Sequence, residues 1–180
     1  MDNEIEKLLP SLQNMKTRER AFSELMRLTK RALYWHIRKI VLVHEDADDV
    51  LQNTYIKVWR SIESFKGECQ LYTWMYRIAT NESLTFLAQQ RARNVSTPLD
   101  YEDLMIQRME ADSYFDADEL QQKFQEAIMT LPEKQRMVFN MRYFDEMEYK
   151  EMSEITGTSE GALKASYHIA VEKIKKIITG

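Results

Sequence analysis

Apolar residues in the C-terminal part of the chain recur at helical spacing on both sides of a glycine. Before the glycine, a helix predicted over residues 149–155 has three apolar residues on one face: Tyr149, Met152 and Ile155. After Gly157, Ser159 is a residue type common at helix N-caps and begins a second predicted helix. The packing face of this second helix comprises Leu163, Tyr167, Ala170 and Ile174. Two short helices joined by a glycine turn are typical of a helix-turn-helix, whose second helix commonly enters a DNA groove.

Helical periodicity extends over most of the remaining chain. The predicted helices span residues 17–43, 46–64, 71–93, 120–130, 133–144, 149–155 and 159–178. Residues 1–93 therefore form a module of three or four helices. The core-facing stripe of its second helix comprises Ala47, Leu51, Tyr55, Val58 and Ile62. Asp46, Asp48 and Asp49 lie at the start of that helix, where acidic side chains cap the backbone and interact favourably with the helix dipole.

Composition supports a helical, cytoplasmic protein. Four glycines and three prolines in 180 residues suit long helices and argue against a β-rich fold. No stretch approaches the roughly 18 apolar residues that span a membrane, and the N-terminus does not resemble a signal peptide. The single cysteine, Cys69, excludes an internal disulfide and fits a reducing compartment.

Charge is distributed unevenly along the chain. The formal net charge is −4, and residues 94–119 contain eight acidic residues against one basic residue, with no sustained helical period. We therefore predict an all-α fold of two small helical domains joined by an acidic linker. The predicted boundaries are residues 1–93, 94–118 and 119–180. The acidic segment is either a plain linker or an acidic strand that lies in a basic channel of a partner.

The predicted helix over residues 46–60 has a second face that differs from its core-facing stripe. This face combines acids, amides, an isoleucine and a tryptophan. Such a mixture is typical of a protein-binding surface. The simpler interpretation is a solvated face whose acids only cap the helix.

Several segments, in this order, resemble bacterial sigma factors. Residues 46–60 resemble their core-polymerase-binding helix, and residues 65–67 with 71–81 resemble their promoter-melting helix. Residues 131–139, followed by the helix-turn-helix over 149–170, resemble their C-terminal domain. Because two such domains are present, the chain is similar to the extracytoplasmic-function (ECF, group 4) class. The resemblance implies a region 2 helical bundle, a region 4 helix-turn-helix, and transcription initiation at specific promoters.

The resemblance implies a docking surface for core RNA polymerase on the helix over 46–60. Its residues would be Asp48, Asp49, Gln52, Asn53, Ile56 and Trp59. The clamp helices of the polymerase β′ subunit would bind this surface, and the β flap would be a second contact of the sigma factor. Asn53 departs from the glutamate that is usual in the family, which keeps a hydrogen-bonding group but removes a charge.

The resemblance also implies that the helix over 71–93 captures the melted strand of the minus-ten element. The implied contacts are Lys66, Tyr72, Trp74, Arg77, Asn81, Arg91 and Arg93. Aromatic rings can stack on unpaired bases, and cations can follow the phosphates. Asn81 occupies the position at which the family holds a flipped-out base. The aromatic residues can also belong to the core, and we expect this for at least one of Trp74 and Tyr76.

For the minus-thirty-five element, the resemblance implies contacts from the C-terminal domain. The implied residues are Arg136, Ser159, Glu160, Lys164, Ala165 and His168. Lys164 suits a phosphate or a guanine, and Ala165 suits a thymine methyl group. Positions that are often basic in the family carry Ser166, Ile169 and Val171. We therefore expect weak binding to the DNA backbone. The spacing of Tyr167 favours a core position over a base contact.

Little in the sequence favours catalysis. The three histidines are far apart, a single cysteine cannot build a zinc site, and no glycine-rich phosphate loop is present. We therefore expect no enzyme activity, no cofactor and no metal. The main alternative is a stand-alone helix-turn-helix regulator that binds duplex DNA as a dimer; an adaptor or anti-sigma antagonist is a weaker one. The expected partners are core RNA polymerase and promoter DNA. The resemblance adds an anti-sigma factor as a further candidate, because one often holds relatives inactive.

Overall fold

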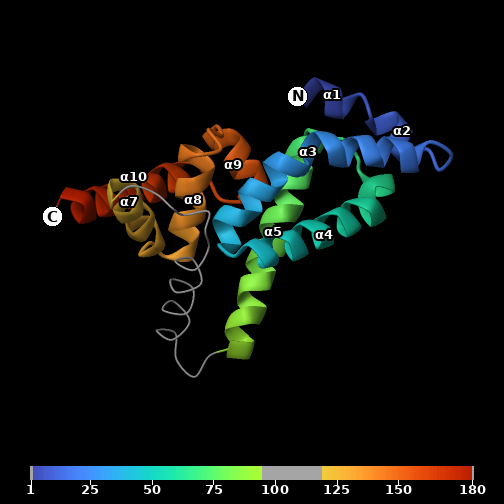
Figure 1. The fold of residues 1–180 in the computed structure, drawn as a ribbon. Helices are drawn as coiled ribbons and strands as arrows, with labels where there is room; N and C mark the ends of the chain where they lie inside the picture. The colour runs from blue at the N-terminus through green and yellow to red at the C-terminus, as the bar shows by residue number, and fades with distance from the viewer. Residues whose placement is uncertain (1, 95–118, 180) are drawn as a thin grey trace.

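The computed structural model describes residues 2–94 and 119–179, and every regular element in these two ranges is helical (Figure 1). The elements are α1 (Asp2–Glu6), α2 (Leu9–Gln13), α3 (Arg18–Val41), α4 (His44–Ser61), the 3₁₀ helix η1 (Ile62–Ser64), α5 (Leu71–Asn94), α7 (Glu119–Met129), α8 (Glu133–Tyr143), α9 (Tyr149–Thr156) and α10 (Glu160–Thr179). The predicted all-α fold is therefore confirmed.

The start of α4 differs from the prediction. The helix begins at His44, and Val43 holds the N-cap position with an extended backbone and no side-chain cap. Glu45 and Asp46 occupy the first turn, where negatively charged side chains interact favourably with the positive end of the helix dipole. Asp48 and Asp49 lie too far into the helix to cap it, so the predicted capping role of these two residues is wrong.

Helices α3, α4 and α5 form the first module, and each packs against the other two. The predicted stripe of α4 lies in the core: Ala47, Leu51, Val58 and Ile62 are all buried. Tyr55 is half-buried, and its hydroxyl group lies 2.9 Å from the hydroxyl oxygen of Thr29 on α3. The hydrophobic periodicity of the sequence therefore identified the face of α4 that packs on its neighbours.

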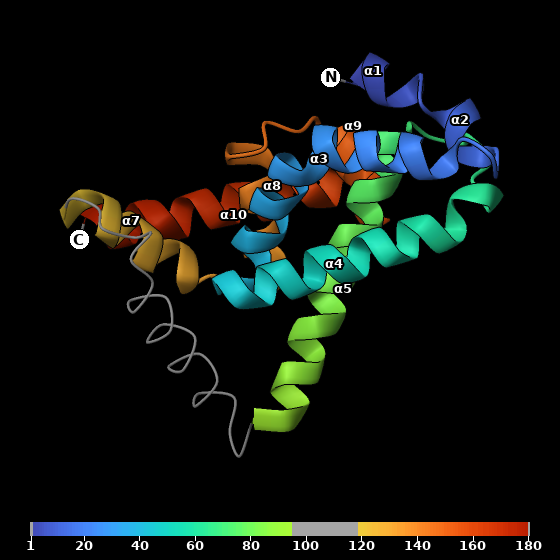
Figure 2. The same cartoon turned by 45° about the vertical axis from the view of Figure 1, so that its right-hand side comes forward.

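Two short helices at the N-terminus were not predicted. α1 and α2 lie at the end of the molecule opposite α7 (Figures 1 and 2). Ile5 and Leu12 are fully buried, so each short helix inserts one aliphatic side chain into the core. The predicted module of three or four helices thus has five α-helices within residues 2–94. α1 and α2 have five residues each, which is too few to show a helical period. The hydrophobic pattern therefore did not predict these two helices.

The second module confirms the predicted order of helix, glycine turn and helix. α10 packs against α7, α8 and α9. Gly157 has a φ of 67°, a left-handed conformation that ends α9 and that glycine adopts without strain. Ser159 Oγ accepts a hydrogen bond from the Ala162 amide at 3.4 Å, as expected of an N-cap residue. On the packing face of α10, Leu163, Ala170 and Ile174 are buried.

The two modules pack directly against each other, although the sequence suggested only that a linker joins them. α9 lies on α5, and α8 lies on α3 (Figure 2). Met141, Met152 and Ile155 of the second module belong to the same hydrophobic cluster as Ile37 and Met75 of the first. A core that is continuous across two sequence modules makes their separation costly, because apolar surface would return to water.

The predicted acidic linker lies outside the described residues, apart from Asn94, which ends α5. The boundaries 1–93, 94–118 and 119–180 therefore stay predictions. Within the described ranges, none of the helices combines the length and apolarity required to cross a lipid bilayer.

The shared core can be tested with a truncation on α9. Met152 is fully buried, so Met152→Ala is expected to lower the free energy of unfolding by about 2–5 kcal/mol through lost burial and a residual cavity. Urea denaturation followed by circular dichroism would measure the loss. Glu154→Ala, at an exposed position of the same helix, should change stability by less than about 0.5 kcal/mol. Equal effects of the two changes would contradict the packing described.

Candidate nucleic-acid interface

One exposed face of α4 brings together most of the residues predicted to bind polymerase. Asp49, Gln52 and Asn53 are exposed. Ile56 and Trp59 are exposed as well, with 46% and 38% of their surface accessible to solvent. Apolar residues with this much exposure beside acids and amides leave a mixed surface open for a partner. The role of this surface in polymerase binding stays a prediction.

Two predicted residues of the α4 surface have partners within the first module. The Trp59 ring packs edge-on against Phe22 at 5.0 Å, and the Arg18 guanidinium lies 5.6 Å from the centre of its ring. Asp48 is half-buried, and its carboxylate lies 3.7 Å from His44 Nε2. Trp59 is therefore held in place before any partner binds, while Asp48 lies at the edge of the surface.

The residues predicted to bind the minus-ten strand are only partly exposed. Lys66 and Asn81 are exposed, whereas Tyr72, Trp74 and Arg77 are half-buried. Trp74 packs on Phe65 at 5.0 Å, and Tyr72 packs on Tyr76 at 4.4 Å. Each of these two aromatic rings therefore has a protein neighbour already.

Tyr76 belongs to the core, which confirms the expectation for at least one of Trp74 and Tyr76. It is 3% accessible, and its ring packs on the His36 ring at 4.7 Å. Burial raises the pKa of its hydroxyl group, so the side chain stays neutral.

Arginines near the end of α5 differ in their surroundings. Arg93 is exposed. Arg91 is also exposed, but its guanidinium forms an ion pair with Glu133 at 2.9 Å, at the start of α8. In this arrangement Arg91 faces the second module, and binding a phosphate would require it to exchange one anion for another.

The outer face of α10 presents the residues predicted to bind the minus-thirty-five element. Ser159, Glu160, Lys164, Ala165 and His168 are all exposed. The Lys164 ammonium group lies 3.6 Å from the Glu160 carboxylate and 5.5 Å from the centre of the Tyr149 ring. An acid one helical turn away weakens the attraction of this surface for phosphate. The weak binding to the DNA backbone stays a prediction.

Two further side chains of the second module have structural roles. Tyr167 is half-buried and stacks on Phe139 at 5.8 Å, as its spacing predicted. Arg136 is also half-buried, and its Nη1 lies 3.5 Å from the Met129 carbonyl oxygen. The predicted phosphate contact of Arg136 thus competes with a contact that joins α7 to α8.

Sequence patterns missed a polar link between the modules. Asp145, which follows α8, accepts a hydrogen bond from His36 Nδ1 at 3.0 Å and forms an ion pair with Lys39. The Thr80 hydroxyl group donates to the Tyr76 carbonyl oxygen at 2.8 Å, and its oxygen lies 2.9 Å from His36 Nε2. These partners are far apart in sequence, and no local motif indicates them.

The Asp145 carboxylate is stabilised in this buried position. Its side chain is 11% accessible. Burial by itself raises the pKa of the carboxyl group, but the hydrogen bond from His36 and the positive Lys39 beside it hold the pKa below its ordinary value. Near the same joint, Asn140 Nδ2 donates to the Lys39 carbonyl oxygen at 3.0 Å. The contact between α3 and the second module is therefore specific as well as apolar.

A cleft between the start of α5 and α9 offers no catalytic arrangement. Its volume is about 350 Å³, and its lining includes Glu68, Glu148, Glu151 and Glu154. Cys69 also lines it, and burial raises the pKa of that thiol, which disfavours the reactive thiolate. No cluster of His, Cys, Asp and Glu in the described part of the chain is arranged to hold a metal ion.

Comparison with known proteins identifies the class of this fold. A family model for sigma-70 region 2 matches residues 25–93, and one for sigma-70 region 4 matches residues 121–174. Over 139 residues the chain is 30% identical to the ECF RNA polymerase sigma-E factor of Escherichia coli strain K12, covering 72% of each chain. It is 28% identical to the ECF RNA polymerase sigma factor SigW of Bacillus subtilis, covering 87% of this chain and 88% of that one. The chain belongs to the ECF RNA polymerase sigma factors.

Two solved structures have a similar fold. CnrH in complex with the cytosolic domain of CnrY is 19% identical, with a TM-score of 0.69 over 97% of both chains. The sigma factor RpoE of Bartonella quintana, in complex with the anti-sigma factor NepR, is 20% identical, with a TM-score of 0.66 over 88% of this chain and 96% of that one. At these identities the likeness concerns the fold.

The polar link is testable through pH. At pH 7, Asp145→Asn is expected to lower the free energy of unfolding by about 2–3 kcal/mol, because Lys39 and His36 lose a buried anion. Since the folded-state pKa of Asp145 is lowered, its contribution is complete above the ordinary carboxyl pKa and is lost as pH falls through the lowered value. The difference between wild type and variant should therefore shrink below about pH 4.

Thermal unfolding between neutral and acidic pH would measure that difference. Glu146→Gln provides the control, because Glu146 is the exposed neighbour of Asp145. A stability difference between wild type and Asp145→Asn that stays constant across the whole pH range would rule out the proposed role of the carboxylate.

Proposed function

We propose that this sigma factor directs transcription initiation through three surfaces on separate helices. The exposed face of α4 binds core RNA polymerase. The 62–70 connection and α5 bind the melted minus-ten strand, and the outer face of α10 binds the minus-thirty-five duplex. The observation that carries the proposal is that members of all three predicted residue sets are exposed on a chain of the ECF sigma family.

The α4 surface has the composition of a protein interface. Ile56 and Trp59 provide apolar area, while Asp49 and Gln52 provide polar groups beside it. Aromatic residues are enriched among those that dominate binding energy, and polar groups around them exclude water. Trp59 is held by Phe22 and Arg18, so little side-chain entropy is lost on docking. The clamp helices of the polymerase β′ subunit are the proposed partner.

The promoter geometry requires the two modules to separate. The minus-thirty-five and minus-ten elements lie about 25 base pairs apart, or roughly 85 Å at 3.4 Å per base pair. A compact chain of this length has a radius of gyration of roughly 16 Å, and so a diameter of about 40 Å. The packed arrangement of α5 and α9 therefore corresponds to a closed state that cannot bind both elements at once.

The chain between the modules is long enough for such an opening. Residues 95–118 number 24, and a fully extended chain of this length spans at most about 80 Å. We propose that binding of α4 to the β′ clamp and of the second module to the β flap provides the free energy that separates α9 from α5. A ligand shifts such an equilibrium only through its higher affinity for the open state.

The exposed face of α4 also distinguishes between the alternative functions. A stand-alone regulator would leave the exposed α4 face without a role, which favours the sigma function. RpoE of Bartonella quintana was solved with an anti-sigma factor, and we propose an anti-sigma factor as a further partner of this chain. As an initiation subunit it assists polymerase, and we propose that it performs no covalent chemistry itself.

Polymerase docking can be tested with purified core from the host. Asp49→Ala/Gln52→Ala is expected to weaken core binding about tenfold or more, because hydrogen-bonding groups at the centre of the surface are lost. Genomic run-off transcription with wild type would identify a promoter, and fluorescence titration would give the core affinity. Glu172→Ala, which removes an exposed acid from α10, should bind core as wild type does. If wild type yields no promoter-specific transcript, the proposed function fails.

Binding of the minus-thirty-five element depends on few cations. Lys164→Ala is expected to reduce transcription from a promoter that carries this element. The salt dependence of promoter binding should also become weaker, by about one released counterion. Run-off transcription at several salt concentrations would show both effects. Lys176→Ala removes an exposed lysine from the far end of α10 and should have a weaker effect. An equal loss in both variants would argue against a specific role for Lys164.

A further inference from the structure

The N-terminal helix pair, residues 2–17 with α1 and α2, lies before the sigma-70 region 2 match, which starts at residue 25. It is nevertheless part of the folded module, since Ile5 and Leu12 are fully buried. α1 contacts α5, and α2 contacts α3 and η1. The pair therefore lies against η1, which begins the 62–70 connection, and against α5, which follows it.

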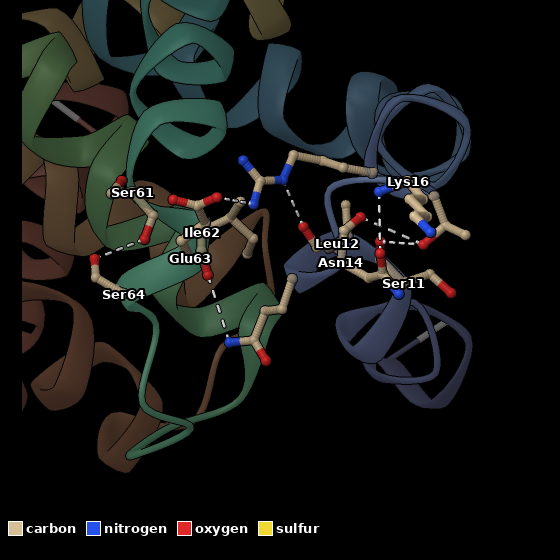
Figure 3. A network of polar contacts seen from close by, with 11 residues as sticks. Ser11, Leu12, Asn14, Lys16, Ser61, Ile62, Glu63 and Ser64 are labelled. Carbon is tan, nitrogen blue, oxygen red and sulfur yellow. Dashed lines mark hydrogen bonds and ion pairs between the residues drawn. The ribbon is translucent and has the colours of Figure 1, made fainter.

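The helix pair holds the start of this connection through backbone carbonyl groups. Gln13 Nε2 donates to the Phe65 carbonyl oxygen at 2.9 Å and lies 3.5 Å from the Ile62 carbonyl oxygen. Figure 3 shows Leu12 of the helix pair on one side of this contact and Ile62 and Glu63 on the other. A side-chain amide that donates to main-chain oxygens fixes the path of the backbone whatever side chains the connection carries.

Arg18 adds a second contact at the same place. Its Nε donates to the Leu12 carbonyl oxygen at 2.9 Å, and its Nη2 forms an ion pair with Glu63. Arg18 is 8% accessible. The guanidinium therefore joins α2 to η1, and Figure 3 labels Leu12 and Glu63, its two partners.

The end of the connection is held by Glu6. Its carboxylate accepts a hydrogen bond from the Leu71 amide, the first residue of α5. Amides in the first turn of a helix have no partner within the helix, and a carboxylate there also interacts favourably with the helix dipole. A residue of α1 thus supplies the N-terminal cap of the helix proposed to bind the minus-ten strand.

Between these two attachments the connection is exposed. Lys66, Gly67 and Glu68 are accessible, and Gly67 has a φ of 71° with open space around its α-carbon. Phe65 packs on Trp74, so the path of the connection also sets the position of that ring. Small changes at either attachment would therefore move Lys66 relative to α5 and shift the Trp74 ring that packs on Phe65.

We propose that Glu6 and Gln13 are positioning residues for minus-ten recognition. By holding both ends of the 62–70 connection, they set its geometry against the melted strand without touching DNA. This inference rests on the proposed function of α5 and the connection. It predicts that loss of either contact lowers discrimination between minus-ten sequences while polymerase binding through α4 is retained.

The test compares Glu6→Ala and Gln13→Glu with wild type in the holoenzyme. Gln13→Glu keeps the shape of the side chain but replaces its donor by acceptor oxygens, which repel the carbonyl oxygens of Phe65 and Ile62. Glu4→Ala is the matched control, because Glu4 is an exposed acid of the same helix. Single-round transcription would be measured on the identified promoter and on a version with one base changed in the minus-ten element.

Discrimination between the two templates is expected to fall about tenfold, or roughly 1.4 kcal/mol, with core affinity unchanged within about twofold. Hydrogen exchange of the backbone amides in residues 62–71 should become faster in both variants and not in Glu4→Ala. Unchanged discrimination, or an equal loss on both templates, would overturn the positioning role. A wild-type chain without promoter-specific transcription overturns the proposed function and the recognition role with it, and faster exchange would then still show that the helix pair holds the connection.

Discussion

The arrangement of the whole chain depends on the contact of α9 with α5, where two modules share one hydrophobic core. Met152 and Ile155 of α9 are removed from water by residues that lie more than fifty positions earlier. Burial of apolar area supplies attraction but little direction. The hydrogen bonds and the ion pair of Asp145 with His36 and Lys39 supply direction, because a buried carboxylate tolerates only an arrangement that satisfies it.

This contact places two requirements on α5. In the closed state the helix buries Met75 and Tyr76 in the core. In the proposed open state its outer residues, Asn81 among them, bind a DNA strand, while α10 lies about two molecular diameters away. Both states can be accessible because the contact contains polar groups that water can solvate after separation. The free energy of the module contact then opposes the proposed assembly with polymerase, and the proposed docking of α4 and of the second module would have to exceed it.

The proposed role of the N-terminal helix pair would let a short segment act on a site that it does not form. Residues 2–17 supply a carboxylate and an amide to the two ends of a connection that they do not belong to. Neither α1 nor α2 is long enough to be stable alone. Ile5 and Leu12 hold them in the core, so their polar contacts are rigid when a strand approaches.

Local regularities were sufficient for the longer helices, because the order of apolar and polar positions shows a period of 3.6 residues, but not for the five-residue helices α1 and α2. The α4 stripe, the Gly157 turn, the Ser159 cap and the exposed faces of α4 and α10 all follow from this period and from residue chemistry. What only the tertiary structure decided involves residues far apart in the chain: the Asp145 link, the packing of α9 on α5, the burial of Tyr76 and the Glu6 cap on α5. The sequence by itself determined the elements and their faces, because these depend on neighbours within a turn or two. Only the fold decided which faces meet, because that depends on shape and charge complementarity between segments that no local spacing connects.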